Sequence, residues 1–243
     1  MKKTIQKYCE KKAYKNINAL RTNSRVNPIC ICIPVYNEYP SFFSTLRSLH
    51  VSSLTYLAYE KNPVPVSIIC CVNARLHDPA RIRENNAKMI YELTRIGFRE
   101  FTDHPVLDLI VLDHSGDNTV FDSNQGVGLA RKIAMDYAVL NGAQVLSCLD
   151  ADTLVSSPYI LCLSLFYKKT RINTNEHQPA WALTGFSHQK AETLEAEKAI
   201  RSYEKYLNEH SRLLYECGTP YYPIALGPTI VCTAEAYAQC GGM

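Results

Sequence analysis

The sequence predicts an α/β protein whose central sheet is mostly parallel and carries helices on both faces. Short apolar runs alternate with segments of helical periodicity in the first half of the chain, and this alternation is typical of such a sheet. Polar residues follow these runs, as expected where strands end in loops at one edge. A chain of 243 residues, 47% hydrophobic and 20% charged, is long enough to bury the core of one such domain.

The first half is predicted to alternate between strands and helices. Asp78-Pro79 is a helix start, because an Asp cap and a first-turn proline suit the free N–H groups there. Ser41 is assigned the same capping role, and Gly97 and Asn141-Gly142 are expected to end helices. In chain order we expect a strand over 29–33, a helix from 41, a strand over 64–72, a helix over 78–97, a strand over 106–112, a helix over 126–140 and a strand over 145–149.

The second half is predicted to contain a long amphipathic helix. We expect its apolar stripe to pack against the core rather than against a partner. The stripe comprises Ala196, Ala199, Ile200, Tyr203, Leu207, Leu213 and Leu214. The expected elements are a helix over 159–169, a strand over 181–186, the long helix over 192–216, a strand over 224–232 and a short helix from 234 into Gly241-Gly242. A glycine pair is an odd place for a domain to end, so we expect the native protein to continue past Met243.

Charge and hydropathy exclude several classes of protein. The 26 basic and 23 acidic residues leave a net charge of +3, which is too weak to favour a nucleic acid partner. No apolar run reaches membrane-spanning length, and the N-terminus lacks the apolar segment of a signal peptide. We therefore expect a cytoplasmic protein without a membrane span, peripheral to a membrane at most.

The ten cysteines are expected to be free thiols in a reduced compartment. No Cys-x-x-Cys occurs, which argues against thiolate zinc sites and redox motifs. Most of the cysteines lie inside apolar strand-like runs, where a thiol behaves as a small apolar group. These are Cys30, Cys32, Cys70, Cys71, Cys148 and Cys232.

Asp150-Ala151-Asp152 is the most informative stretch of the sequence. It closes the apolar run 145–149, so it is predicted to lie at the carboxyl end of a strand, where ligands bind in open α/β sheets. Side chains two apart on an extended segment point the same way. Paired carboxylates suit Mg²⁺ or Mn²⁺, which commonly bind through one or two of them plus substrate phosphates. The alternative interpretation is an acidic strand-to-loop turn.

Other strand ends are expected to gather along the same edge. They are Pro34, Val35, Tyr36, Asn37 and Glu38, then Asn73, then Asp113. Asn37 and Asn73 can hydrogen-bond a base or ribose, or can simply serve turn geometry. Arg131 can offer a guanidinium fork to a diphosphate, or can face solvent on its helix.

Several other chemistries lack their motifs. Gly126-Val127-Gly128 hints at a dinucleotide fingerprint, but its third glycine position is Arg131 and no strand directly precedes it. The chain has no Walker A lysine motif, no Gly-x-Ser-x-Gly and no His-Glu-x-x-His. Its histidines show no ligand spacing.

Four segments in register resemble family 2 glycosyltransferases of GT-A fold. They are Ile31-Cys32-Ile33-Pro34-Val35-Tyr36-Asn37-Glu38, Asn124-Gln125-Gly126 with Ala130-Arg131, Leu149-Asp150-Ala151-Asp152, and Gly227 with Cys240-Gly241-Gly242. The resemblance implies a GT-A (Rossmann-like) domain over 28–243 after an N-terminal lead-in over 1–27. Residues 28–155 would bind a nucleotide-diphosphate sugar, and 156–243 would form an acceptor-side half that is incomplete at its C-terminus.

The resemblance also implies roles for single residues. The 34–38 loop would flank the nucleotide together with Asn73, Arg131 and Ala151. Asp150 would lie near the ribose and the metal, and Asp152 would bind Mg²⁺ or Mn²⁺ more directly. The sugar would pass, with inversion, to a hydroxyl of a glycan, a lipid or another acceptor.

The sequence departs from the family pattern at three places. The segment Val72-Asn73-Ala74-Arg75 lacks the usual Asp-rich turn, and Lys132 stands where the family commonly has Asn. The Glu-Asp pair that supplies the base normally follows the Gly-Gly segment, so the base is expected beyond Met243; Glu235 is interpreted as a first-turn helix acid. Two other functions stay open: a sugar nucleotidyltransferase, and a nucleotide-sugar-binding module without transfer activity.

Overall fold

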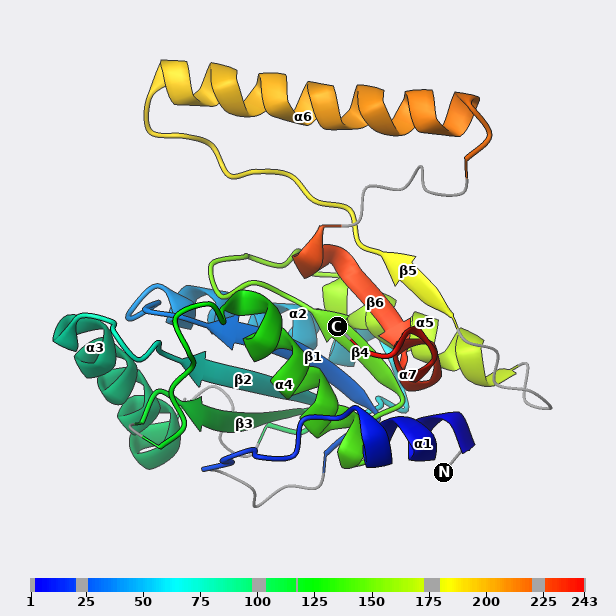
Figure 1. Cartoon of the computed structure of the whole chain (residues 1–243). Coiled ribbons are helices and arrows are strands. Elements are labelled where there is room, and N and C mark those ends of the chain that lie inside the picture. The colour runs from blue at the N-terminus through cyan, green and yellow to red at the C-terminus, as the bar shows by residue number, and fades with distance from the viewer. Residues whose placement is uncertain are drawn as a thin grey trace.

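One six-stranded sheet, in the order β3-β2-β1-β4-β6-β5, organises the chain (Figure 1). The computed structural model describes residues 3–20, 26–97, 104–116, 118–172, 180–219 and 226–242. β1 (Ile29–Val35) lies between β2 (Val66–Asn73) and β4 (Val145–Cys148), and β3 (Leu107–His114) pairs with β2; these pairings are all parallel. β6 (Ile230–Thr233) is antiparallel to β4, and β5 (Trp181–Leu183) is antiparallel to β6. The mostly parallel sheet is confirmed.

Helices cover both faces of this sheet, as predicted. Every residue of β1 and β2 is buried, which explains why their sequences are continuous apolar runs. The core on one face is completed by α2 (Phe42–Tyr59), α3 (Ala80–Tyr91), the π-helix Glu92–Gly97 and α5 (Tyr159–Ile172). The core on the other face is completed by α1 (Lys3–Lys11), α4 (Val127–Leu140) and α7 (Ala234–Cys240). No helix among the described residues is long and apolar enough to cross a membrane.

Two predicted helix caps are wrong. Ser41 has helical backbone angles, and its hydroxyl donates to the Glu38 carbonyl at 2.9 Å instead of accepting from the helix. The Asp78 carboxylate accepts from the Arg75 backbone N–H at 2.7 Å and from the Tyr36 hydroxyl at 2.8 Å. Both side chains are therefore used in loop contacts, and Pro79 directly precedes α3.

Some strand boundaries also differ from the prediction. β3 continues to His114, so Asp113 belongs to the strand and not to the loop after it. Residues 227–229 of the strand predicted over 224–232 form the 3₁₀ turn Gly227–Thr229 instead, and residues 224 and 225 lie outside the described part of the chain. β5 ends at Leu183, short of the predicted residue 186.

The long helix α6 (Leu194–Glu216) corrects a further expectation. None of its residues is buried, so its apolar stripe does not pack into the core. Figure 1 shows α6 apart from the sheet, at the end of the loop that follows β5. Ion pairs along its polar side, from Arg201 to Glu197 at 2.7 Å and from Arg212 to Glu216 at 2.5 Å, support the helix locally. Helical periodicity predicts that one face of a helix is apolar, but it does not predict which surface covers that face.

The cysteines are free thiols, as predicted. The six cysteines assigned to apolar runs are all buried. Burial raises the pKa of Cys148 and of Cys232 to about 12. These thiols are therefore protonated at neutral pH and behave as core side chains.

Helix α1 is joined to the second core by a buried polar cluster. The Asp136 carboxylate of α4 is fully buried and accepts from the Tyr8 hydroxyl at 2.5 Å, the Tyr14 backbone N–H at 2.7 Å and the Tyr237 hydroxyl at 2.8 Å. The Lys132 ammonium donates to the same carboxylate at 2.8 Å. Gly242, at φ +83°, lies so close to α1 that a Cβ there would stand 2.2 Å from the Tyr8 hydroxyl. The glycine pair that ends α7 thus permits this close approach.

Candidate active site

The sheet has a topological switch point beside β1. From β1 the chain moves outward through β2 and β3 on one side, and it then returns to form β4 on the other side. β1, β2 and β4 are parallel, so their carboxyl ends share one edge of the sheet. Ligands of open α/β sheets bind at such an edge, where the strand order reverses.

A small cavity of about 230 Å³ lies at this edge. It brings together most of the predicted site residues, from the ends of three strands. Its lining consists of Pro34, Tyr36, Glu38, Asn73, Val127, Asp150, Ala151 and Asp152. Val35 and Asn37 do not line it. Val35 is fully buried in the core, and the Asn37 side chain accepts from the Asn85 amide at 2.9 Å.

A second, larger cavity of about 930 Å³ shares Asp150 and Asp152 with the small one. Its walls come from the loop after β4, the loop after β5 and the 3₁₀ turn before β6. They include Arg131, Asp150, Asp152, Tyr159, residues 184–188 and residues 226–229. The two aspartates therefore stand where the cavities meet. Ligand pockets commonly have volumes of about 300–1,000 Å³.

Asp150 and Asp152 lie in a turn rather than on an extended segment. β4 ends at Cys148, and the Thr153 N–H donates to the Asp150 carbonyl at 3.2 Å. The alternative interpretation, an acidic turn, is thus correct for the backbone. Both residues nevertheless line both cavities. Asp150 is ion-paired with Arg131 at 2.6 Å. Asp152 is exposed and makes no hydrogen bond or ion pair with the described residues.

Hydroxyl groups of α2 hold this acidic turn in place. The buried Thr45 hydroxyl donates to the Ala151 carbonyl at 2.7 Å. One turn further along, the Ser48 hydroxyl accepts from the Val155 N–H at 3.0 Å. Ser52 then donates to the Ser157 carbonyl at 2.9 Å and accepts from the Ile160 N–H at 3.0 Å. The sequence analysis missed these supports, although hydroxyls at 45, 48 and 52 follow helical spacing.

Arg131 is buried, contrary to the alternative of a solvent-facing residue. Its side chain is 10% exposed, and its Nε is buried without a hydrogen-bond partner among the described residues. The guanidinium reaches Asp150 by passing close to Gly227: a Cβ at Gly227 would stand 2.5 Å from Nη1 and 2.8 Å from Cζ. Gly227 therefore leaves the space in which the Arg131–Asp150 ion pair forms.

Replacing Gly227 by alanine is expected to displace the Arg131 guanidinium from Asp150. Crowding of this kind costs about 1–3 kcal/mol. Under the metal assignment proposed below, the loss of the group that orients Asp150 would also lower metal affinity about 10–100-fold. Urea unfolding and metal titration measure the two effects. Gly128→Ala is the matched control, because a Cβ there meets nothing within 4 Å. Equal metal affinity in Gly227→Ala and Gly128→Ala would contradict the expectation.

The loop after β1 is built by side chains from β2 and α3. Asn73 is buried, and its amide donates to the Val35 carbonyl at 3.0 Å. Its Oδ1 has no partner among the described residues, and Asn73 lines the small cavity. Asn37 has φ +58°, which fits the turn interpretation of this residue. Burial is the larger cause that raises the pKa of Tyr36, and the hydrogen bond to Asp78 is the second. The Tyr36 hydroxyl therefore stays protonated.

The donor set at Asp150 and Asp152 fits a divalent cation that also binds substrate oxygens. In the part of the chain that the structure describes, no three His, Cys, Asp or Glu side chains are grouped so that they could hold an ion by themselves. The carboxylates of Asp152, which is unpaired among the described residues, and of the partly exposed Asp150 together supply hard oxygen donors. Mg²⁺ typically binds to one or two carboxylates and fills its remaining positions with phosphate oxygens and water.

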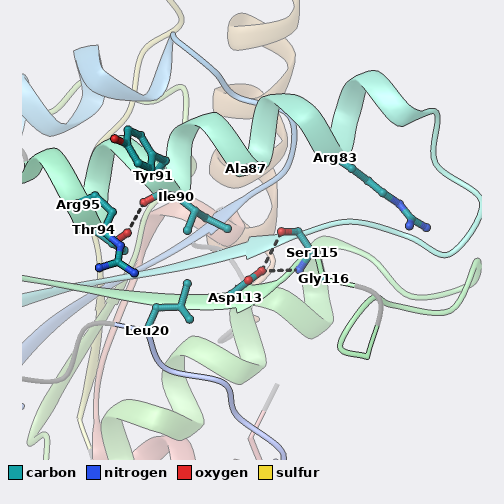
Figure 2. A pocket seen from close by; sticks show the side chains of 10 residues that line it. All are labelled: Leu20, Arg83, Ala87, Ile90, Tyr91, Thr94, Arg95, Asp113, Ser115 and Gly116. Atoms are coloured by element: carbon teal, nitrogen blue, oxygen red, sulfur yellow. Dashed lines mark hydrogen bonds between the residues drawn. The ribbon is translucent and has the colours of Figure 1, made fainter.

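Asp113 does not join this site. It lines a third cavity, of about 680 Å³, between β3, α3 and the π-helix (Figure 2). Its carboxylate accepts from the Ser115 N–H and hydroxyl, both at 2.8 Å. β3 is three strands from β4, about 14 Å at the usual strand spacing. Arg83 and Arg95 lie at opposite ends of the view in Figure 2, so these cations do not converge.

Comparison with known proteins gives a distant likeness in fold. No protein-family model matches the chain, and no curated protein matches it. Two crystal structures of S. aureus TarS 1–349 are similar. The one in complex with UDP-GlcNAc is 12% identical with a TM-score of 0.39, over 68% of this chain and 38% of that chain. The other is 13% identical with a TM-score of 0.44, over 87% of this chain and 48% of that one. The chain thus spans less than half the length of either.

Proposed function

We propose that the chain binds a nucleotide-diphosphate sugar together with Mg²⁺ or Mn²⁺ and transfers the sugar, with inversion, to an acceptor hydroxyl. One observation carries the proposal. Asp150 and Asp152 stand at the meeting point of two cavities, at the switch point of the sheet. A donor of this type has a nucleoside at one end, a sugar at the other and a diphosphate between them. The arrangement of the cavities matches that order.

The small cavity suits the nucleoside. It offers the Asn73 Oδ1 as a hydrogen-bond acceptor and the Tyr36 side chain as an aromatic surface. Arg75 lies over the Tyr36 ring at 5.6 Å and donates to the Gln125 carbonyl at 3.0 Å, which fixes the ring next to the loop before α4. The larger cavity then has room for the sugar and for the acceptor.

The diphosphate would lie beside Asp150, Asp152 and Arg131. A divalent ion held by the two carboxylates would act as a Lewis acid on the departing diphosphate. Arg131 pairs with Asp150 and lines the larger cavity. Guanidinium groups bind phosphate oxygens through paired N–H donors, so Arg131 would also hold the diphosphate as its charge grows.

Thermal unfolding with and without donors tests this function. UDP, GDP and dTDP sugars, UDP-GlcNAc among them, are added with Mg²⁺ or Mn²⁺. At a donor concentration 100 times Kd, binding stabilises the fold by about 2.7 kcal/mol, which corresponds to a rise in Tm of roughly 5–10 °C for a chain of this size. EDTA should remove most of the rise, and sugar 1-phosphates should not produce it. A Tm unchanged by every donor in the presence of metal would overturn the proposal.

A further inference from the structure

His188 stands in the wall of the larger cavity, in the loop between β5 and α6. It shares that cavity with Asp150 and Asp152 but belongs to a different part of the chain. The cavity therefore holds an imidazole that the donor-binding residues do not use. Its side chain is 36% exposed, so it is accessible to a ligand.

The imidazole of His188 is held by contacts with α6. Its Nδ1 lies 3.0 Å from Glu204 Oε1, and the same oxygen accepts from the His188 backbone N–H at 2.8 Å. The other oxygen of Glu204 pairs with Arg201 at 2.5 Å. The rings of Phe186 and Tyr203 pack edge-on against the imidazole, at centroid distances of 5.8 and 5.7 Å. The ring is thus fixed from three sides.

These contacts set the tautomer of the neutral imidazole. The hydrogen bonds from the His188 backbone and ring hold the pKa of Glu204 at about 2, so Glu204 is a carboxylate at neutral pH. A carboxylate beside Nδ1 accepts a hydrogen bond from the Nδ1–H group, so the proton stays on Nδ1 and the lone pair is on Nε2. Nε2 has no hydrogen-bond partner among the described residues.

Charged and titratable groups surround His188 from two sides. Arg201 on α6 also approaches the His188 carbonyl, at 3.5 Å. On α6 the groups are Glu204, Arg201 and Tyr203, and across the cavity they are Asp150, Asp152, Arg131 and Tyr159. Glu204 is the group in direct contact with the ring, so it dominates the orientation of the imidazole.

We propose that His188 is the general base that takes the proton of the acceptor hydroxyl, with Glu204 as its positioning residue. The inference rests on the proposed function. As the acceptor oxygen forms its bond to the anomeric carbon, its proton passes to Nε2. The bond between the anomeric carbon and the diphosphate oxygen breaks, and its electron pair stays on the diphosphate. The imidazolium then releases the proton to water.

This role also gives α6 a function, although none of its residues is buried. Its contribution is the Glu204 carboxylate and the Tyr203 ring, which orient an imidazole on the neighbouring loop. An orienting carboxylate, a histidine and a hydroxyl form the arrangement that activates nucleophiles in many enzymes. The described chain therefore contains a base, although the resemblance to family 2 glycosyltransferases implied one beyond Met243.

Release of nucleoside diphosphate, with water as acceptor, measures this role. The whole chain, with Mg²⁺ or Mn²⁺, is given the donor that raises its Tm most, and release is followed from pH 5 to 9. Wild-type release should fall toward the acidic end of this series, because an imidazolium has no lone pair with which to take a proton. His188→Gln should lower release about 10²–10⁴-fold and remove this acidic limb, while the donor-induced rise in Tm stays. Glu204→Gln should lower release less and change the position of the limb.

His210→Gln is the matched control, because His210 lies on α6 and, within the described part of the chain, only stacks on Tyr206 with a centroid distance of 6.0 Å. It should release nucleoside diphosphate like the wild type. If His188→Gln unfolds, His188→Asn replaces it, with loss of release and retained donor binding expected.

The outcomes separate the two proposals. If no donor raises the Tm of the wild type, the proposed function fails, and the base fails with it. If a donor binds, the base alone is overturned by any of three results. These are wild-type rates in His188→Gln, an equal loss of binding and release in that variant, and a wild type that releases nothing.

Discussion

Asp152→Asn is expected to abolish metal-dependent donor binding while leaving the fold unchanged. Asp152 is exposed and makes no hydrogen bond or ion pair with the described residues, so its removal should alter the free energy of unfolding by less than about 0.5 kcal/mol. Loss of a metal-binding carboxylate should weaken the binding of Mn²⁺ by more than about 100-fold, since even groups that only orient a ligand contribute 10–100-fold. Urea unfolding and calorimetric titration with Mn²⁺ and donor measure both quantities.

Asp150→Asn separates a binding role from a structural one at the same turn. Its charge pairs with the buried Arg131, so this variant should lose about 1–2 kcal/mol of stability as well as metal affinity. Asp122→Asn is the control for a change of charge alone, because Asp122 is exposed and lies outside the cavities. A scaffold without a metal site predicts equal donor and Mn²⁺ titrations for Asp152→Asn and Asp122→Asn, and that result would refute the metal assignment.

The strands and their polar ends were predictable because the central strands are buried on both faces. β1 and β2 are apolar at nearly every position, so no other element competes for those segments. The rule that ligands bind at the carboxyl ends of strands then brought Pro34, Asn73 and Asp150 to one cavity. Asp113 lies at the same edge, as the rule predicts, but strand order, which the sequence does not state, places β3 three strands from β4 and Asp113 outside this cavity.

Contacts between distant segments account for what the sequence did not reveal. Asp78 has the residue type of a helix cap, but Tyr36 and Arg75 use its carboxylate. Gly227 and Arg131 meet only because β6 lies beside β4. The pairing of His188 with Glu204 spans 16 residues across a loop, and no local sequence pattern predicts it. The apolar periodicity of α6 correctly predicted an amphipathic helix, but its apolar face does not pack on the core of the sheet.

Asp136→Leu is expected to cause the largest loss of stability. The carboxylate is fully buried and accepts from the Tyr8, Tyr14, Lys132 and Tyr237 groups described above. Its removal takes the carboxylate away from two hydroxyls and from the Lys132 ammonium, which keeps only its hydrogen bond to the Tyr8 hydroxyl at 2.8 Å among the described residues. Breaking a buried ion pair from one side costs about 3–5 kcal/mol. Urea unfolding should record this loss, and Asp122→Leu, at an exposed position, should stay within about 0.5 kcal/mol of wild type.

The double variant Lys132→Met with Asp136→Leu decides whether charge or shape matters at this cluster. Replacing both partners of a buried pair by apolar groups is often close to neutral, because neither charge is then left alone. The double variant should therefore be more stable than Asp136→Leu, although the Tyr8 and Tyr237 hydroxyls have still lost the carboxylate as their acceptor. If the two variants are equally unstable, the cost comes from those hydroxyls and the Tyr14 N–H. In that case the hydrogen bonds that reach Asp136 from α1, from the segment after it and from α7 stabilise this cluster, and the Lys132–Asp136 ion pair within α4 does not.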